Sequence, residues 1–187
     1  MYSLIIGLPF ELSFSSYFDD QSHIADNLNI LSFDLSNTNA GFAPFAKYAE
    51  KMYSIDKMVD VMKEIAINGN RQIYLFGGGD DEKRKLQEWE SKNPNVTSVV
   101  CMLTLENELL LMSNLSLVVS MDSAYMHLSS LVNTPVVSVW DATHPFLGFY
   151  GYSQDSKNAV QIELDCRPCS VLAMFLVGGA TMHAWNE

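Results

Sequence analysis

The sequence predicts an α/β protein in which a parallel sheet is covered by helices on both faces. From residue 41 onward, short apolar runs alternate with segments whose apolar residues recur at helical spacing. The runs are almost continuously apolar, which is typical of strands buried on both faces. The chain has 187 residues, the length of about one domain.

The first clear helix is predicted to begin after Ser54, a plausible N-cap, with Asp56 in its first turn. Its apolar positions recur at helical spacing over residues 55–66, and Asn68-Gly69-Asn70 ends it. The elements predicted after it are a strand at 72–76, a helix at 80–92, a strand at 96–101, a helix at 104–112, a strand at 116–120, a helix at 123–132, a strand at 135–140 and a strand at 160–164.

Residues 1–40 differ from the rest of the chain. They are rich in Ser, Asn, Asp and Phe and contain only short apolar runs. We expect irregular structure there, with one strand near residues 28–34.

The charge balance excludes several classes of function. Eleven Lys and Arg face 22 Asp and Glu, a net charge of −11. A nucleic-acid groove or a patch for anionic membranes needs clustered positive charge, so neither is expected. Any phosphate must be bound locally, by helix ends, hydroxyl groups and one or two cations.

The chain is predicted to be a soluble protein of the cytoplasm, which is a reducing compartment. Three cysteines do not make a disulfide scaffold, and no basic segment of a secretory signal opens the chain. The apolar run 171–182 is about half the length that spans a bilayer.

Ligands of a parallel sheet bind beyond the carboxyl ends of its strands. That rule selects the loops 77–82, 101–104, 121–127 and 141–148, and the loop 42–51 is a fifth candidate.

The segment 120–127 ends one of these strands and begins a helix. Asp122 and Ser123 could simply cap that helix. Alternatively, the free N–H groups and the Ser123 hydroxyl face a phosphate, which His127, one turn further on, could also reach.

Other candidates also have two interpretations. Gly77-Gly78-Gly79 permits close approach of the backbone but matches neither a dinucleotide fingerprint nor a P-loop. Asp80, Asp81 and Glu82 are either ordinary acids of a helix start or partners for ribose hydroxyls. Lys47 and Lys51 are either solvated or neutralise a diphosphate.

Thr143 lies in a turn restrained by Pro145, and its hydroxyl is a candidate phosphate contact. Cys166 and Cys169 have Cys-x-x-Cys spacing, but zinc needs four ligands and the chain has no second pair. Cys101 is expected in a core strand. We therefore predict no metal site and no cofactor.

Together these segments resemble the C-terminal half of glycosyltransferase family 9, the ADP-heptose:lipopolysaccharide heptosyltransferases. The resemblance covers roughly residues 41–169, and the block Asp122-Ser123 followed by His127-Leu128 is its most specific part. The matching segments are 43–46 (APFA), 51–53 (KMY), 74–78 (YLFGG), 117–128 (LVVSMDSAYMHL), 134–137 (TPVV) and 142–148 (ATHPFLG).

The resemblance implies a GT-B fold of two Rossmann-like domains, of which the C-terminal one holds the nucleotide-sugar. It also implies transfer of a heptose-like sugar from an ADP-sugar to a lipopolysaccharide core acceptor, without an essential metal. Carried over by position, Lys51 lies near the diphosphate and sugar, and Asp122 binds the donor sugar. Ser123, His127 and Thr143 belong to phosphate-facing loops, and Asp81 is the acid near the ribose.

Two departures from the family pattern qualify this reading. Residues 1–40 are too short for the family's N-terminal domain, which carries acceptor contacts and the general base. We therefore expect donor binding with little transfer by this chain alone. The alternatives are one half of a two-chain transferase and a non-catalytic α/β binding or structural module. The partner expected of the chain is a second copy of itself or the missing N-terminal half in trans, and the location expected is the cytoplasm or the inner membrane surface.

The second departure is the tail. We divide the chain into an N-terminal remnant (1–40), a nucleotide-sugar-binding domain (41–170) and an atypical tail (171–187). Residues 179–187, read one base out of phase with suitable codons, give Gly-Asp-Tyr-Ala-Cys-Leu-Glu-stop, which matches the family pattern. We therefore hypothesise a frameshifted 3′ end, which sequencing of the coding DNA tests.

Overall fold

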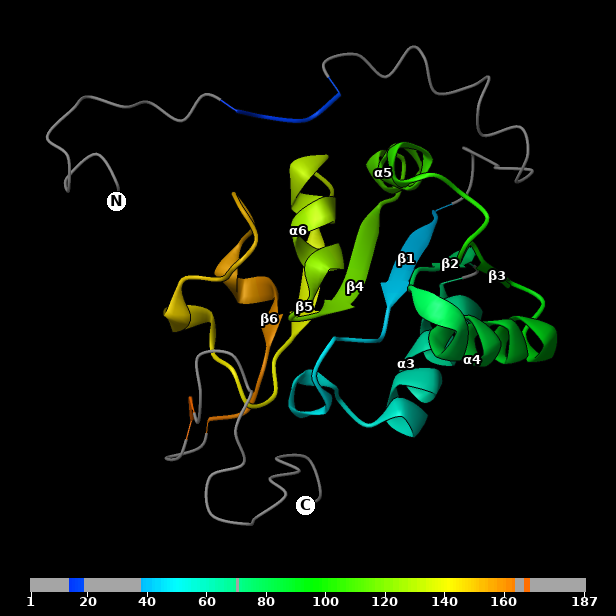
Figure 1. The fold of residues 1–187 in the computed structure, drawn as a ribbon, viewed down its shortest axis with the longest axis horizontal. Helices are drawn as coiled ribbons and strands as arrows, with labels where there is room; N and C mark the ends of the chain where they lie inside the picture. Colours follow the sequence, from blue (N-terminus) through cyan, green and yellow to red (C-terminus); the bar gives the residue numbers. More distant parts are fainter. Residues whose placement is uncertain (1–13, 19–37, 70, 164–166, 169–187) are drawn as a thin grey trace, which may run out of the picture.

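The sheet is fully parallel and reverses its strand order at β1. The computed structural model describes residues 14–18, 38–69, 71–163 and 167–168. Its six strands lie in the order β3-β2-β1-β4-β5-β6 (Figure 1). They are β1 (Ala40–Ala43), β2 (Ile73–Leu75), β3 (Val96–Ser98), β4 (Leu117–Met121), β5 (Val136–Val139) and β6 (Ala159–Val160).

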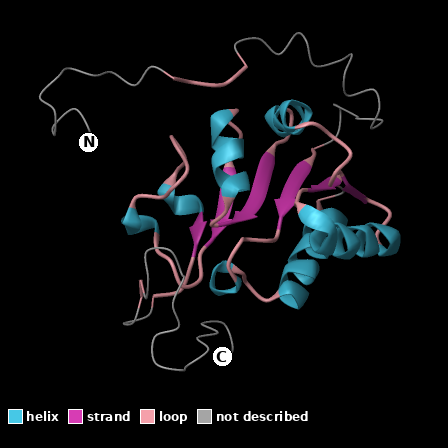
Figure 2. Cartoon of the chain, viewed as in Figure 1, coloured by secondary structure: helices cyan, strands magenta, loops and turns pink. Residues whose placement is uncertain are grey.

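Helices cover both faces of this sheet, as predicted. Alternate residues of a strand point to opposite faces, so Val119 packs with Met58 and Met62 of α3 on one face. Val118, its neighbour in β4, packs with Leu111 of α5 on the other. The helices are α3 (Ile55–Asn68), α4 (Gly79–Lys92), α5 (Leu105–Ser113) and α6 (Ala124–Leu131), with 3-10 turns η3 (Ala49–Lys51), η4 (Pro145–Leu147) and η5 (Ser156–Asn158) (Figure 2). The predicted Rossmann-like α/β fold is confirmed.

The central strand β1 was not predicted. Ala40 pairs with Ile73 of β2 and with Leu117 of β4, which places β1 in the middle of the sheet. Gly41 is needed there, because a Cβ at this position would lie 2.9 Å from side-chain atoms of both Leu115 and Val118. The strand therefore has only one large apolar residue, and the sequence shows no run of the kind that marks the other strands.

The other elements match the prediction closely, with two corrections. Thr104 caps α5, where its hydroxyl accepts a hydrogen bond from the Asn107 N–H at 3.3 Å. The prediction of a core strand through Cys101 is wrong: β3 ends at Ser98, and Cys101 is exposed in a turn with a φ of +57°. The last strand covers residues 159–160 rather than 160–164, and Leu164 lies outside the described residues.

The predicted strand near 28–34, Cys166, Cys169 and the tail 171–187 also lie outside the described residues. Within the described ranges, none of the helices combines the length and apolar character required to cross a bilayer.

Candidate functional site

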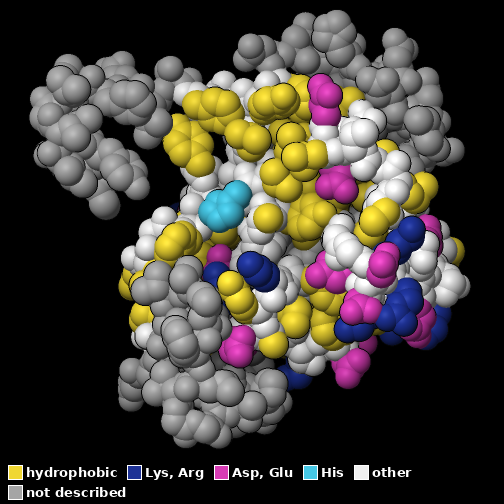
Figure 3. All heavy atoms as spheres, viewed as in Figure 1, with side chains coloured by type: hydrophobic (Ala, Val, Ile, Leu, Met, Phe, Trp, Pro, Cys, Tyr) yellow, Lys and Arg dark blue, Asp and Glu magenta, His cyan; other side chains and the backbone are white. Residues whose placement is uncertain are grey.

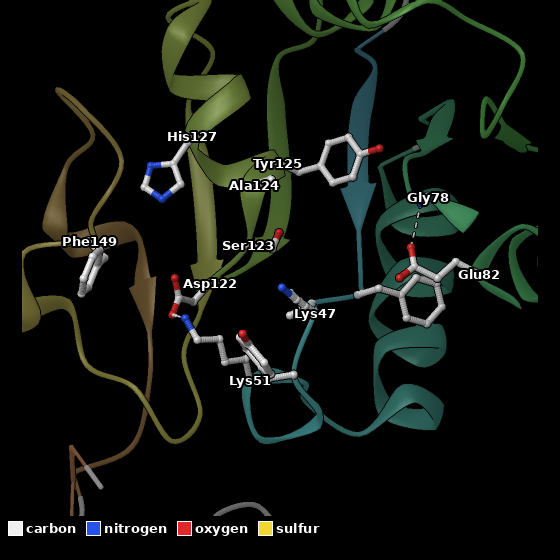
Figure 4. A pocket seen from close by; sticks show the side chains of 13 residues that line it. Lys47, Lys51, Gly78, Glu82, Asp122, Ser123, Ala124, Tyr125, His127 and Phe149 are labelled. Atoms are coloured by element: carbon white, nitrogen blue, oxygen red, sulfur yellow. Dashed lines mark hydrogen bonds and ion pairs between the residues drawn. The ribbon is translucent and has the colours of Figure 1, made fainter. Parts of the chain in front are cut away.

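A cavity of about 600 Å³ lies at the carboxyl ends of β1, β2 and β4. This is the edge where a parallel sheet binds ligands, and β1 and β4 flank the point where the strand order reverses. Three of the five nominated loops line the cavity, and Figure 4 shows their side chains converging on it. The lining residues are Phe45, Ala46, Lys47, Tyr48, Lys51, Gly78, Glu82, Asp122, Ser123, Ala124, Tyr125, His127 and Phe149.

An ion pair between Lys51 and Asp122 forms one wall of the cavity. The Lys51 Nζ lies 2.5 Å from the Asp122 Oδ2, and the side chains are only 14% and 5% exposed (Figure 4). The buried Thr143 hydroxyl donates to the same carboxylate oxygen at 2.8 Å. The carboxylate is therefore compensated by both a cation and a hydroxyl group, as a buried charge requires.

Backbone contacts hold the two partners in place. Lys51 ends the turn η3, and Asp122 directly follows β4. The Ala142 N–H, in the loop after β5, donates to the Glu50 carbonyl at 3.1 Å. Three segments that are far apart in the sequence thus meet at this wall.

Helix capping does not explain the Asp122-Ser123 pair. Ser123 occupies the N-cap position of α6, but its side chain makes no capping hydrogen bond. Its hydroxyl lies 3.2 Å from the Ser120 hydroxyl, while Asp122 binds Lys51 and Thr143. Ser123 and Ala124 both line the cavity, so the first turn of α6 faces it.

The opposite wall is formed by the loop between β2 and α4. The Gly78 N–H donates to the Glu82 Oε2 at 2.8 Å, and both residues line the cavity (Figure 4). Asp81 is not among the lining residues: its side chain is 86% exposed and pairs with Arg84. In Figure 3 acidic and basic side chains gather over α4, the surface to which this pair belongs.

Behind this loop, Tyr125 connects the cavity to a buried acid. Its hydroxyl donates to the Gly77 carbonyl at 2.9 Å and lies 3.5 Å from the Glu108 Oε2. Burial raises the pKa of Glu108 from 4.5 to about 7, although the Tyr125 hydroxyl acts in the opposite direction. Burial, and then the nearby charge of Glu108, raise the pKa of Tyr125.

Of the predicted site residues, Lys51, Asp122, Ser123 and His127 line the cavity. Thr143 lies behind the wall, bonded to Asp122 instead of facing the cavity. The loop 101–104 contributes nothing to the lining.

Tyr125 and Glu108 were not predicted as partners, and Glu82 was not distinguished from Asp80 and Asp81. One signal was present: Glu108 shares the apolar face of α5 with Leu109 and Met112 at helical spacing. Its burial and its contact with α6 depend on tertiary structure.

Several solved structures are similar to this chain. The Escherichia coli ADP-heptose LPS heptosyltransferase II matches with 19% identity and a TM-score of 0.69, over 89% of this chain and 51% of that one. The E. coli heptosyltransferase WaaC with ADP matches with 20% identity and a TM-score of 0.62, over 85% and 46%. A glycosyl transferase family 9 protein of Veillonella parvula matches with 16% identity and a TM-score of 0.62, over 75% and 39%.

At these identities the likeness shows the fold, and the chain spans about half the length of the two E. coli enzymes. No curated protein sequence gives a significant match. A family model described as glycosyltransferase family 9 (heptosyltransferase) matches residues 2–174, so the match extends well beyond the 41–169 indicated by the motifs. With nearly the whole chain matched and the fold shared, this chain belongs to glycosyltransferase family 9.

Proposed function

We propose that the cavity binds an ADP-sugar, with a heptose-like sugar, as the donor of a glycosyl transfer. The observation that supports this most directly is the Lys51–Asp122 pair beside the first turn of α6. It places a cation, a carboxylate and a helix N-terminus at one wall of one cavity. The E. coli WaaC structure contains ADP, and that of the heptosyltransferase TibC contains ADP-D-β-D-heptose.

In this proposal the diphosphate lies between Lys51 and the start of α6. Breaking the sugar–phosphate bond increases the negative charge on the ADP leaving group. The Lys51 ammonium group and the N–H groups at Ser123 and Ala124 would stabilise that charge. The Lys51 charge is shared with Asp122, so Lys47, which also lines the cavity, and these N–H groups would add the local positive potential that a diphosphate requires in an acidic protein.

Asp122 has the chemistry to bind the sugar. Its Oδ2 accepts hydrogen bonds from Lys51 and Thr143, and these two bonds fix the position of the carboxylate in the cavity wall. A carboxylate oxygen accepts hydrogen bonds from sugar hydroxyls, which would hold the anomeric carbon near the diphosphate.

The opposite wall suits the nucleoside. Glu82 is already oriented by the Gly78 N–H and can accept from ribose hydroxyls. Phe45 lies on the same cavity and offers an aromatic surface to the base. Glu82 therefore replaces Asp81 as our candidate for the ribose contact.

We further propose that this chain supplies the donor-binding half of the transferase. A second half would then bind the acceptor, a lipopolysaccharide core at the inner membrane surface, and supply the general base. Sugar transfer by this chain alone is expected to be weak or absent, and to appear when the other half is supplied in trans.

Calorimetry with ADP and ADP-heptose tests donor binding. We expect Lys51→Met to weaken ADP binding about tenfold or more, since a hydrogen bond to a charged group contributes about 1.5–3 kcal/mol. Lys63→Met is the matched control, because Lys63 lies on the exposed side of α3, outside the cavity.

Asp122→Asn separates the sugar from the nucleotide. It should weaken ADP-heptose binding more than ADP binding, because only the former carries the heptose hydroxyls that Asp122 is proposed to bind. If the unmodified chain binds no ADP at millimolar concentration, the proposed function is wrong and a non-catalytic α/β module is favoured.

A further inference from the structure

Arg167, in the Cys-x-x-Cys segment, contacts the loop that follows β5. Its Nη2 donates to the Thr143 carbonyl at 2.6 Å and lies 3.5 Å from the Trp140 carbonyl. Its Nη1 donates to the Ile162 carbonyl, and Nη2 lies 3.4 Å from the Gln161 Oε1. One guanidinium group therefore joins the segment after β6 to both ends of residues 140–143.

This loop carries two of the contacts that build the cavity wall. The Thr143 hydroxyl donates to Asp122, and the Ala142 N–H donates to the carbonyl of Glu50, the residue before Lys51. Ala142 lies between the two residues whose carbonyls Arg167 contacts, Trp140 and Thr143, and Thr143 is itself one of them. Moving that backbone would displace the hydroxyl from Asp122 and the N–H from the turn of Lys51.

We propose that Arg167 is a positioning residue of the donor site. This inference rests on the proposed function: Arg167 contacts no cavity-lining residue in the hydrogen bonds above, and acts through the loop 140–143 on Asp122 and Lys51. Arginine suits this role because its planar group presents five N–H donors in a fixed geometry, enough for several carbonyls at once. A lysine has three donors on one nitrogen and cannot span the same set.

The first test needs no ligand. Amide hydrogen exchange is measured in the unmodified chain, in Arg167→Met and in Arg167→Lys. We expect Arg167→Met to speed exchange of the Ala142 amide about tenfold relative to the Val119 amide of β4, with Arg167→Lys between the two. Unchanged exchange at Ala142 would overturn the inference. Arg84→Met, at an exposed arginine of α4, is the control and should change neither amide.

The second test compares ADP with adenosine, which lacks the diphosphate. Arg167→Met should weaken ADP binding about tenfold and leave adenosine binding within about twofold, because a displaced wall acts on the diphosphate. Equal weakening of both ligands would show general damage to the structure and overturn the inference. If the unmodified chain binds neither ligand, the proposed function fails, and the exchange experiment alone decides whether Arg167 anchors the loop.

Discussion

The two walls of the cavity are built in different ways. At the Lys51 wall (Lys51 and Asp122, with Thr143 behind them), the hydrogen bonds join residues 71 and 21 positions apart in the sequence. At the Glu82 wall (Gly77, Gly78 and Glu82), the hydrogen bond between Gly78 and Glu82 spans only four positions. The first wall therefore exists only when the sheet is assembled, whereas the contact that orients Glu82 in the second is a property of one loop and the helix after it. One longer-range contact, from the Tyr125 hydroxyl to the Gly77 carbonyl, joins that loop to α6.

Burial follows the same division. Asp122 is 5% exposed, so its charge depends on its partners, whereas Gly78 is open to solvent. The charged part of a ligand would therefore meet a buried, mutually paired set of groups, whereas Gly78 and Glu82 are fully or partly open to solvent. Substitutions at the Lys51 wall should therefore affect stability much more than substitutions at the Glu82 wall.

The largest effect is expected for Asp122→Ala. It leaves the Lys51 ammonium group, 14% exposed, without its carboxylate, and removing one partner of a buried pair costs about 3 kcal/mol or more. Urea denaturation measures the loss of free energy of unfolding. Asp60→Ala is the control, because Asp60 is 76% exposed and lies 3.8 Å from Lys63, so a loss below about 0.5 kcal/mol is expected.

A double substitution sharpens this prediction. Asp122→Ala with Lys51→Met should be less destabilising than the sum of the two single changes, because no charge is then left unpaired. Strict additivity would mean that the two groups are not coupled, and the wall would not depend on their pairing.

The next effect concerns Glu108, behind the Glu82 wall. The pKa of this carboxyl is raised by burial to about 7, against 4.5 ordinarily. The folded chain keeps the proton up to about pH 7, whereas the unfolded chain loses it near pH 4.5. Stability should therefore fall as the pH rises through this window, by up to about 3 kcal/mol.

Glu108→Gln removes this titration and keeps the shape of the side chain. The difference in free energy of unfolding between the unmodified chain and Glu108→Gln should change by about 2 kcal/mol between pH 5 and pH 8, with the unmodified chain losing stability. The same difference at both pH values would contradict the raised pKa.

The contrast between the walls also explains what the sequence could predict. Lys51 was nominated separately, as one of two lysines in the loop 42–51 and by its place in the family pattern. Helical periodicity identified α3, and the rule for the carboxyl ends of parallel strands placed Asp122 at the site. Both signals are local or follow from topology alone. The central strand β1 was missed because Gly41 is imposed by its neighbours Leu115 and Val118, which belong to other segments.

Side-chain partners within the site were less predictable. Thr143 was nominated for phosphate, yet it donates to Asp122, because the loop after β5 brings its hydroxyl to the residue that follows the neighbouring strand β4. Asp81 and Glu82 are adjacent acids, and successive residues of a helix point about 100° apart. In α4, which begins at Gly79, Glu82 lines the cavity and Asp81 does not. Which of the two acids faces the cavity depends on the residue at which the helix begins, and the sequence does not fix that residue to within one position.

A smaller effect is expected for Gly77→Ala at the Glu82 wall. A Cβ there would lie 2.9 Å from both the Glu82 Oε2 and the Leu86 Cδ1, and Leu86 is fully buried. Crowding of this kind costs about 1–2 kcal/mol of unfolding free energy in denaturation. Gly78→Ala is the matched control: a Cβ there meets nothing within 4 Å, and the backbone is extended with a φ of −145°. Equal losses in the two variants would refute the crowding at Gly77.

The smallest effect is expected for Asp81→Asn. The Asp81–Arg84 pair is 86% and 78% exposed, so losing it should change the free energy of unfolding by less than about 0.5 kcal/mol. Binding of ADP should stay within about twofold, whereas Glu82→Gln should weaken it by more, since Glu82 alone of these two acids lines the cavity. Calorimetry on both variants distinguishes them. If Asp81→Asn weakens ADP binding and Glu82→Gln leaves it unchanged, the ribose lies at Asp81. The loop after β2 would then have to rearrange around the ligand.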